Sequence, residues 1–107
     1  MNSRSLLAAL TSLCGVSIKQ ISEATGVRLP RLREVEQGWP LRVVDQEPFN
    51  SYAKWLLRDV HAAASKQMLA PPKLRRHPDL RRRVQDLAEA YQAAFGIAIS
   101  DDCEVSK

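Results

Sequence analysis

Cysteine is scarce in this sequence, which excludes two classes of small protein. Cys14 and Cys103 are the only cysteines among 107 residues, no CxxC pair occurs, and only two histidines accompany them. A zinc site needs clustered Cys and His ligands, and a disulfide framework needs several paired cysteines. We therefore expect no metal and no cofactor, with Cys14 buried and Cys103 exposed in a reducing cytoplasm.

The sequence also lacks the patterns of an enzyme and of a membrane protein. It contains no GxSxG motif and no glycine-rich phosphate loop, and neither His61 nor His77 lies in a catalytic setting. No stretch approaches the roughly 20 apolar residues that a membrane span requires. We predict a protein that is not an enzyme and has no contact with a membrane.

What the sequence does have is helical periodicity and an uneven basic charge. Sixteen basic residues against twelve acidic residues give a net charge of +4. A chain of this length buries one core, and its apolar residues recur at helical spacing, so we predict an all-α, compact helix bundle. The first expected helix spans residues 3–13, and a long helix over residues 48–64 closes the core.

Residues 17–38 are the most informative stretch, and they predict two short helices joined by a tight turn. Ser17 and Gln20 form an S-x-x-Q capping box, which fixes where the first of these helices begins. Gly26 ends it, because the chain must take a left-handed step there that favours glycine.

The second helix of this pair is predicted over about residues 28–37. Its Pro30 lies in the first turn, where the missing amide hydrogen has no intrahelical partner. Val27, Leu32 and Val35 point inward together. The opposite face is free to contact a partner, and it carries Pro30, Arg33, Glu34 and Gln37, with Leu29 at its edge.

This pair of helices resembles a known family. The segments ISEATGV and LREVEQG are similar to the helix-turn-helix of the Cro and phage-repressor (XRE-like) family, whose recognition helix ends in an apolar-Glu-Asn/Gln-Gly signature close to residues 35–38. The resemblance extends from the first helix to Gly38. It implies a lambda-repressor-like bundle that binds double-stranded DNA as a symmetric dimer and controls transcription.

The resemblance also implies which residues contact DNA. Leu29 and Pro30 depart from the glutamine or serine often found in the family and offer only apolar contact, for instance to a thymine methyl. Arg33 is therefore the first choice for a bidentate contact to guanine. The expected DNA-binding residues are Ser17, Lys19, Gln20, Arg28, Leu29, Pro30, Arg31, Arg33, Glu34 and Gln37.

One further position departs from the family's pattern. Many relatives pair the glutamate equivalent to Glu36 with an arginine in the first helix, where this chain has Thr11. We expect Glu36 to pair with Arg4 or Arg58, or to stay solvated.

The expected organisation is a DNA-binding domain over residues 1–64 followed by three smaller parts. Pro71-Pro72 and basic residues predict a linker over residues 65–78. Residues 79–99 hold a helix and a short extension, in which Ile97-Ala98-Ile99 is open to adding a strand. Residues 100–107 are expected to be a disordered acidic tail.

The helix after this linker carries an apolar stripe that must be buried, either on the core or against a second copy. We favour dimerisation, because a protein that reads half-sites needs a two-fold axis. The expected dimer residues are Leu80, Val84, Leu87, Tyr91 and Phe95. Trp39 and Trp55 are expected to pack on the domain, with a dimer contact as the alternative.

A basic cluster near the start of this helix has two interpretations. It is either a solvated helix face beside the linker or a second set of phosphate contacts. The cluster comprises Arg75, Arg76, Arg81, Arg82 and Arg83, with Lys73 nearby.

These observations predict a cytoplasmic transcriptional regulator, most simply a repressor that binds an inverted repeat as a homodimer. The alternative is a protein-interaction module with the same fold, such as an antitoxin, an anti-repressor or a polymerase-binding adaptor. Leu29 and Pro30 are the residues that keep this alternative open, because neither can donate or accept a hydrogen bond through its side chain.

Overall fold

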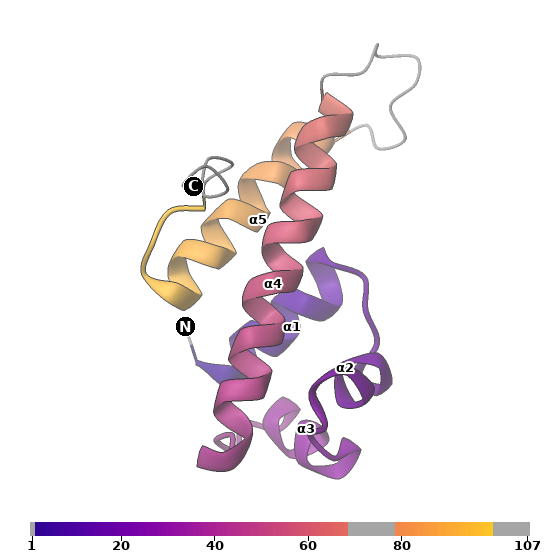
Figure 1. Ribbon diagram of the computed structural model, residues 1–107, viewed down its shortest axis with the longest axis vertical. Coiled ribbons are helices and arrows are strands. Elements are labelled where there is room, and N and C mark those ends of the chain that lie inside the picture. The colour runs from indigo at the N-terminus through magenta and orange to yellow at the C-terminus, as the bar shows by residue number, and fades with distance from the viewer. Residues whose placement is uncertain (1, 69–78, 100–107) are drawn as a thin grey trace.

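A long helix, α4 (Val43–Met68), runs along most of the molecule, and the other helices lie around it (Figure 1). The computed structural model describes residues 2–68 and 79–99. Within these residues the chain forms five helices and no strand, which confirms the all-α prediction and excludes the strand considered for residues 97–99. The remaining helices are α1 (Ser3–Leu13), α2 (Ile18–Thr25), α3 (Leu29–Glu36) and α5 (Leu80–Phe95).

The start of α2 is fixed by the predicted capping box, which the structure confirms. The Ser17 hydroxyl accepts a hydrogen bond from the Gln20 amide at 3.1 Å, and the Gln20 side chain accepts one from the Ser17 amide at 2.7 Å. These bonds satisfy amide groups near the helix start, and such a cap contributes about 1 kcal/mol.

The turn between α2 and α3 is built around Gly26, which has a left-handed φ of 80°. The Ser22 hydroxyl donates to the Val27 carbonyl at 2.6 Å, and the Thr25 hydroxyl accepts from the Val27 amide at 3.2 Å. These bonds hold Val27 in a buried position and fix the direction in which α3 leaves the turn.

Replacing Gly26 with alanine is expected to lower the free energy of unfolding by about 1–2 kcal/mol, the usual cost of a left-handed backbone for an L-residue. A Cβ at this position would meet no atom within 4 Å, so the cost lies in the backbone alone. Gly26→Asn is the matched control, because asparagine tolerates this conformation better. Urea unfolding should show a smaller loss for Gly26→Asn, and equal losses would contradict the explanation.

The end of α3 is a Schellman motif. The Gly38 amide donates to the Val35 carbonyl at 3.0 Å, and the Trp39 amide donates to the Glu34 carbonyl at 3.0 Å. Gly38 has a positive φ of 104°. The predicted termination of α3 near Gly38 is therefore confirmed, and the chain turns there toward α4.

One hydrophobic core joins all five helices. The side chains predicted to point inward from the turn and from α3 are buried in it, and Leu6, Leu7 and Leu10 of α1 join them. The core residues contributed by α1, α2, α3, their connections and the first part of α4 include Leu6, Leu7, Leu10, Ile21, Val27, Leu32, Val35, Leu41, Phe49 and Leu57.

The apolar stripe of α5 packs within its own chain, against α4 and α1. Leu80, Leu87 and Tyr91 are almost completely buried, and Val84 and Phe95 are partly buried against the same core. The assignment of this stripe to a dimer contact is therefore corrected. The apolar periodicity of this helix predicted that the stripe is buried, and in the structure it is buried against α4 and α1.

The start of α4 also differs from the prediction. The helix begins at Val43 instead of near residue 48, so Pro48 lies inside it and the preceding loop is shorter. Asp45 stands in the first turn, where a carboxylate interacts favourably with the helix dipole. Residues 65–68 continue α4, which corrects the predicted start of the linker. Residues 69–78 and the predicted tail over residues 100–107 lie outside the described residues.

None of the helices in the described part of the chain is by itself long and apolar enough to cross a membrane. Only α1 and α2 taken together have the required composition and length, and they are bent by 114° relative to each other.

Candidate functional site

The outward face of α3 is the strongest candidate for a functional surface. This helix lies at one end of the molecule, beside the start of α4 (Figure 1). Its Leu32 and Val35 are buried, whereas Pro30, Arg33 and Glu34 are exposed. The residues predicted to face a partner are therefore not sealed inside the fold.

Five of the predicted contact residues line one shallow hollow on this face, of about 350 Å³. Its surface is mostly apolar, because Leu29 and Pro30 at the start of α3 have no polar side-chain atoms. Charged and polar groups stand further along the helix. The lining residues are Leu29, Pro30, Arg33, Glu34 and Gln37.

Ion pairs along α3 involve its exposed arginines. Arg31 Nη1 lies 3.4 Å from Glu34 Oε1, and Arg33 Nη1 lies 3.7 Å from Glu36 Oε1. The partner of Glu36 is thus Arg33, which corrects the expectation of Arg4, Arg58 or solvent. The pairing follows from the i, i+3 spacing on one helix. With 62% of the Arg33 side chain exposed, the pair is worth less than about 1 kcal/mol and can exchange for another partner.

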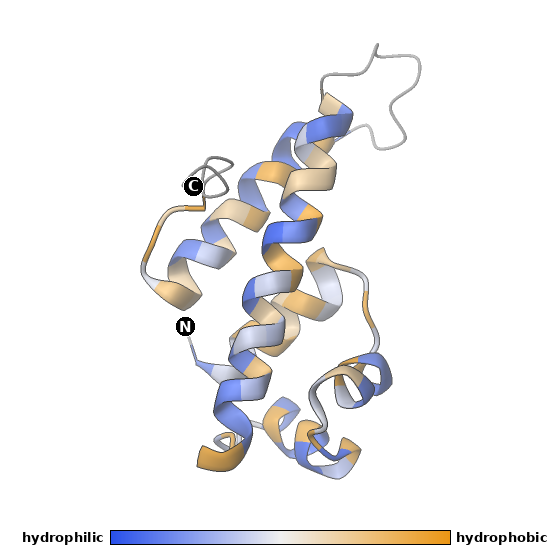
Figure 2. Cartoon of the chain, in the orientation of Figure 1, coloured by the Kyte–Doolittle hydropathy of each residue, from blue (hydrophilic) through white to orange (hydrophobic). Residues whose placement is uncertain are grey.

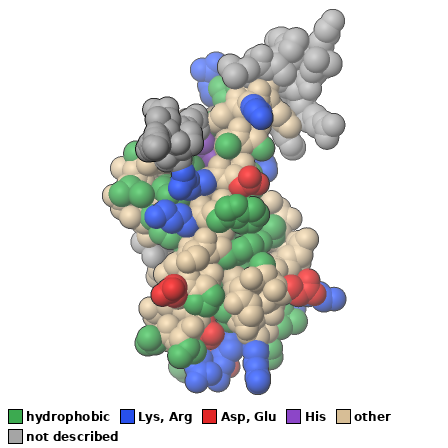
Figure 3. Space-filling model, viewed as in Figure 1, with side chains coloured by type: hydrophobic (Ala, Val, Ile, Leu, Met, Phe, Trp, Pro, Cys, Tyr) green, Lys and Arg blue, Asp and Glu red, His purple; other side chains and the backbone are tan. Residues whose placement is uncertain are grey.

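A second hollow, of about 180 Å³, brings three arginines together. Arg28 and Arg31 come from the start of α3, and Arg42 comes from the residue just before α4. Asp45 is the carboxylate in the lining, with Gly26 completing it. Figure 3 shows Lys and Arg side chains gathered at the lower end of the molecule, where α3 lies in Figure 1.

Arg42 is the residue of this hollow that the sequence analysis missed. It stands between the helices predicted over residues 28–37 and 48–64, and no spacing rule connects it to Arg28 or Arg31. A basic residue directly before the start of α4 was the signal that could have found it. The sequence analysis placed the start of this helix near residue 48, so the signal was not visible. The path of the chain from Gly38 to Val43 is what brings Arg42 to the hollow.

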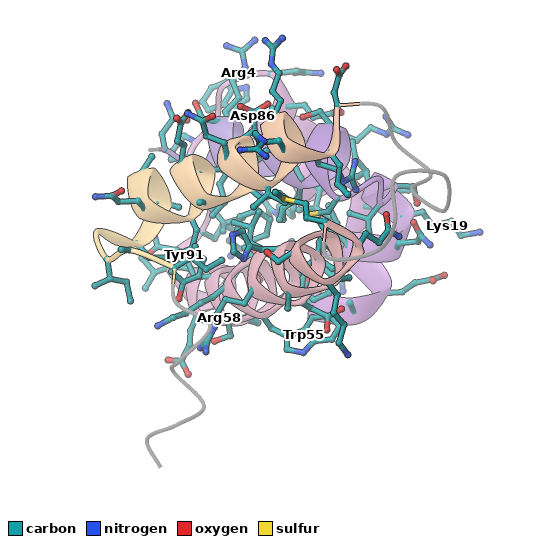
Figure 4. All side chains as sticks on the ribbon, turned by 90° about the horizontal axis from the view of Figure 1, so that it is seen from above. Arg4, Lys19, Trp55, Arg58, Asp86 and Tyr91 are labelled. Atoms are coloured by element: carbon teal, nitrogen blue, oxygen red, sulfur yellow. The ribbon has the colours of Figure 1, made fainter. Side chains whose placement is uncertain are left out.

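The predicted contacts at the start of α2 lie outside both hollows. Ser17 and Gln20 are exposed, but each already bonds to the other in the capping box. Lys19 is exposed, and its side chain extends away from α2, as Figure 4 shows, where it can reach a phosphate group. The predicted contact residues at the start of α2 therefore form a surface separate from the outward face of α3.

The basic cluster on α5 has a different environment. Arg81 and Arg82 share a surface hollow with the carboxylates of Asp79, Asp86 and Glu89, and Arg82 Nε lies 4.0 Å from Asp86 Oδ2. The helix begins at the end of the molecule opposite α3 (Figure 1). These acidic neighbours offset the positive charge and favour the interpretation as a solvated face. Arg75 and Arg76 lie outside the described residues.

Large hydrophobic side chains are exposed near α3 and on α4. Val43 is 82% exposed and Val44 is 74% exposed, and both stand in the first turn of α4, which is coloured hydrophobic in Figure 2. Trp39 and Trp55 are also exposed, so the expectation that they pack is wrong. Figure 4 places Trp55 on the side of α4 that faces away from α5, where its ring lies 6.0 Å from that of Tyr52.

Cys14 is partly buried at the end of α1, beside the core. Burial raises the pKa of its thiol from the ordinary value of 9.0 to about 11, and the positive charge of Arg83 offsets part of this increase. The thiol is therefore protonated at neutral pH and is a poor nucleophile.

In a Cys103→Ser variant, alkylation of Cys14 by iodoacetamide at pH 8 is expected to be about 100-fold slower in the native protein than in urea, since two pKa units separate the thiolate fractions. Between pH 9 and about 11 the Cys14 thiol stays protonated in the native protein and ionises in the unfolded chain. The free energy of unfolding is therefore at its full value below pH 9 as far as this group is concerned, and it falls as the pH rises from 9 to about 11. Equal rates in the two states would contradict this prediction.

Comparisons of this chain with protein-family models, with curated proteins and with solved structures find no match. Its function must therefore be argued from the geometry of the surface.

Proposed function

We propose that this protein is a sequence-specific DNA-binding regulator of transcription that represses by occupying an inverted repeat as a homodimer. The observation that carries the proposal is the exposed outward face of α3, with a cluster of three arginines beside its first turn. In this proposal α2, the Gly26 turn and α3 form a DNA-binding helix-turn-helix, and the bundle is of the lambda-repressor type.

The diameter of a helix such as α3 suits the major groove. An α-helix with its side chains is about 10–12 Å across, and the groove of B-DNA is about 12 Å wide and admits one α-helix. The core holds α3 by Leu32 and Val35, so its outward face is rigidly presented. A rigid helix places the same side chains against the same base edges in every complex.

Arg33 is the residue that we assign to base reading. Its guanidinium has the fork of donors that matches O6 and N7 of guanine. In the free protein this group pairs with Glu36 at 3.7 Å, and the pair is weak because both side chains are exposed. Binding of DNA would exchange one weak partner for a bidentate one.

Arg28, Arg31 and Arg42 are the residues that we assign to the phosphate backbone. Arg28 and Arg31 flank Leu29 and Pro30 in the sequence at the start of α3, so the two hollows share this end of the helix. In this proposal both hollows contact one duplex. Phosphate contacts supply most of the affinity and fix the register, whereas base contacts supply the specificity.

The homodimer in this proposal uses a surface other than the buried stripe of α5. Trp55, at 58% exposure, and its neighbour Tyr52 provide an aromatic surface on α4 for such a contact. Aromatic side chains are enriched in protein interfaces.

Selection of bound fragments from random duplex DNA, with the molar mass of the complex measured in parallel, tests the proposal. An inverted repeat bound by two chains would support it. Failure to enrich any sequence would overturn it, and a single half-site bound by one chain would overturn the dimer.

The second candidate function is a protein-interaction module, and one observation favours it. Val43, Val44 and Trp39 expose apolar surface close to the end of the molecule that carries α3. An apolar patch of this kind marks many protein-binding sites. In this case the selected pool would stay random, while the protein would co-purify with a partner that covers Trp39.

A further inference from the structure

We infer that the apolar hollow on α3 binds the C5-methyl group of a pyrimidine in the DNA major groove. The inference rests on the proposed function and specifies what the site reads. The hollow is lined by Leu29 and Pro30 from the first turn of α3 and by Arg33, Glu34 and Gln37 further along.

The chemistry of the lining selects a methyl group. Leu29 and Pro30 have no polar side-chain atoms, so they cannot satisfy a donor or an acceptor on a base edge. Placing an amino or carbonyl group against them would leave that group without a hydrogen bond. The apolar group that natural base pairs present in the major groove is the C5-methyl of thymine, and 5-methylcytosine carries a methyl on the same ring carbon.

The charge around the hollow identifies the occupant as DNA and not as an apolar protein segment. Arg28, Arg31 and Arg42 line the second hollow, at the start of the same helix, and one carboxylate, that of Asp45, lines it with them. A polyanion provides further partners for these arginines, of which Arg31 is held only by an exposed pair with Glu34, whereas an apolar helix from a protein partner would provide none.

The helical spacing also gives the neighbour of the methylated base. Arg33 follows Pro30 by three residues and Leu29 by four, so all three side chains share one face of α3. The hollow places the apolar pair and the guanidinium on one surface. The methyl group therefore belongs to a pyrimidine adjacent to the guanine that Arg33 contacts.

The test uses the duplex recovered from the random pool and replaces its thymines by uracil one at a time. Uracil differs from thymine only in lacking the C5-methyl. We expect about four-fold weaker binding at one position in each half-site, the effect of exposing one buried methyl group, and no change at the other positions. At the same position, a 5-methylcytosine–guanine pair should bind about four-fold more tightly than an unmethylated pair.

Two variants connect the effect to the hollow. Leu29→Ala should bind the thymine duplex about four-fold more weakly and the uracil duplex almost unchanged, because the methyl contact is already absent there. The matched control is Val44→Ala, which removes an exposed apolar side chain that does not line the hollow. It should keep the full ratio between thymine and uracil.

The outcomes separate this inference from the proposed function. If a sequence is enriched but no thymine-to-uracil replacement weakens binding to the wild-type protein, the methyl site is excluded while DNA binding stands. If no sequence is enriched, the proposed function itself fails. A methyl effect that Leu29→Ala leaves at full size would place the methyl contact elsewhere and overturn the assignment to this hollow.

Discussion

Replacement of Arg28, Arg31 and Arg42 together by glutamine is expected to weaken DNA binding by two to three orders of magnitude per protomer at about 0.1 M salt. Each neutralised phosphate contributes about 0.9 to the slope of log affinity against log salt. Loss of three contacts in each protomer should therefore make the slope shallower by about 2.7 per protomer. The three residues are exposed or half-buried at the surface, so the fold should tolerate the change. Titration of a labelled duplex over a range of salt concentrations measures both quantities.

The matched control removes the same charge from a different surface. Replacement of Arg81, Arg82 and Arg83 by glutamine also lowers the net charge by three, but these residues start α5 at the end of the molecule opposite α3. We expect the salt slope of this variant to stay that of the parent. Equal salt slopes for the two triple variants would mean that the arginine hollow does not bind phosphates more than the control surface does. A shallower slope for the control variant alone would assign the phosphate contacts to α5.

Leu87→Ala is expected to lower the free energy of unfolding by about 2–5 kcal/mol, the usual cost of truncating a fully buried leucine. Leu87 has no exposed surface and lies where α5 packs on the core. The loss combines the apolar contacts of the removed atoms with the cavity that they leave. Chemical unfolding followed by circular dichroism measures it.

This experiment also checks how the stripe of α5 is covered. If α5 packs within its own chain, the loss caused by Leu87→Ala is the same at all protein concentrations. A loss that shrinks as the protein is diluted would indicate that the stripe contacts a second copy, because a dimer contact stabilises the fold only at concentrations where the dimer forms. Ile97→Ala is the control, because Ile97 is half exposed and its truncation should change stability by less than about 0.5 kcal/mol.

The features of the fold that the sequence predicted are those with local causes. The capping box at Ser17 and the left-handed step at Gly26 depend on residues within one or two turns of each other. Pro30 and Gly38 mark the ends of α3 for the same reason. Because α3 lies between such local signals, its outward face was predicted correctly down to individual residues.

The features that sequence reasoning missed depend on the tertiary structure. Val43 and Val44 are exposed, so the first turn of α4 has no apolar stripe to reveal it, and Pro48 indicated a later start. The stripe of α5 indicated only that it must be buried, since periodicity does not say against which surface. Arg42 reaches the other arginines through the path of the chain after α3.

The central claim is that α3 reads bases through Arg33. Binding of Arg33→Ala to the selected duplex, and to duplexes changed at each base pair in turn, tests it most directly. We predict a loss of about 1–3 kcal/mol in affinity and a relaxed preference at one base pair, with an unchanged helical circular-dichroism spectrum. If Arg33→Ala binds the best duplex as tightly as the parent and discriminates equally at every position, α3 does not read DNA through Arg33.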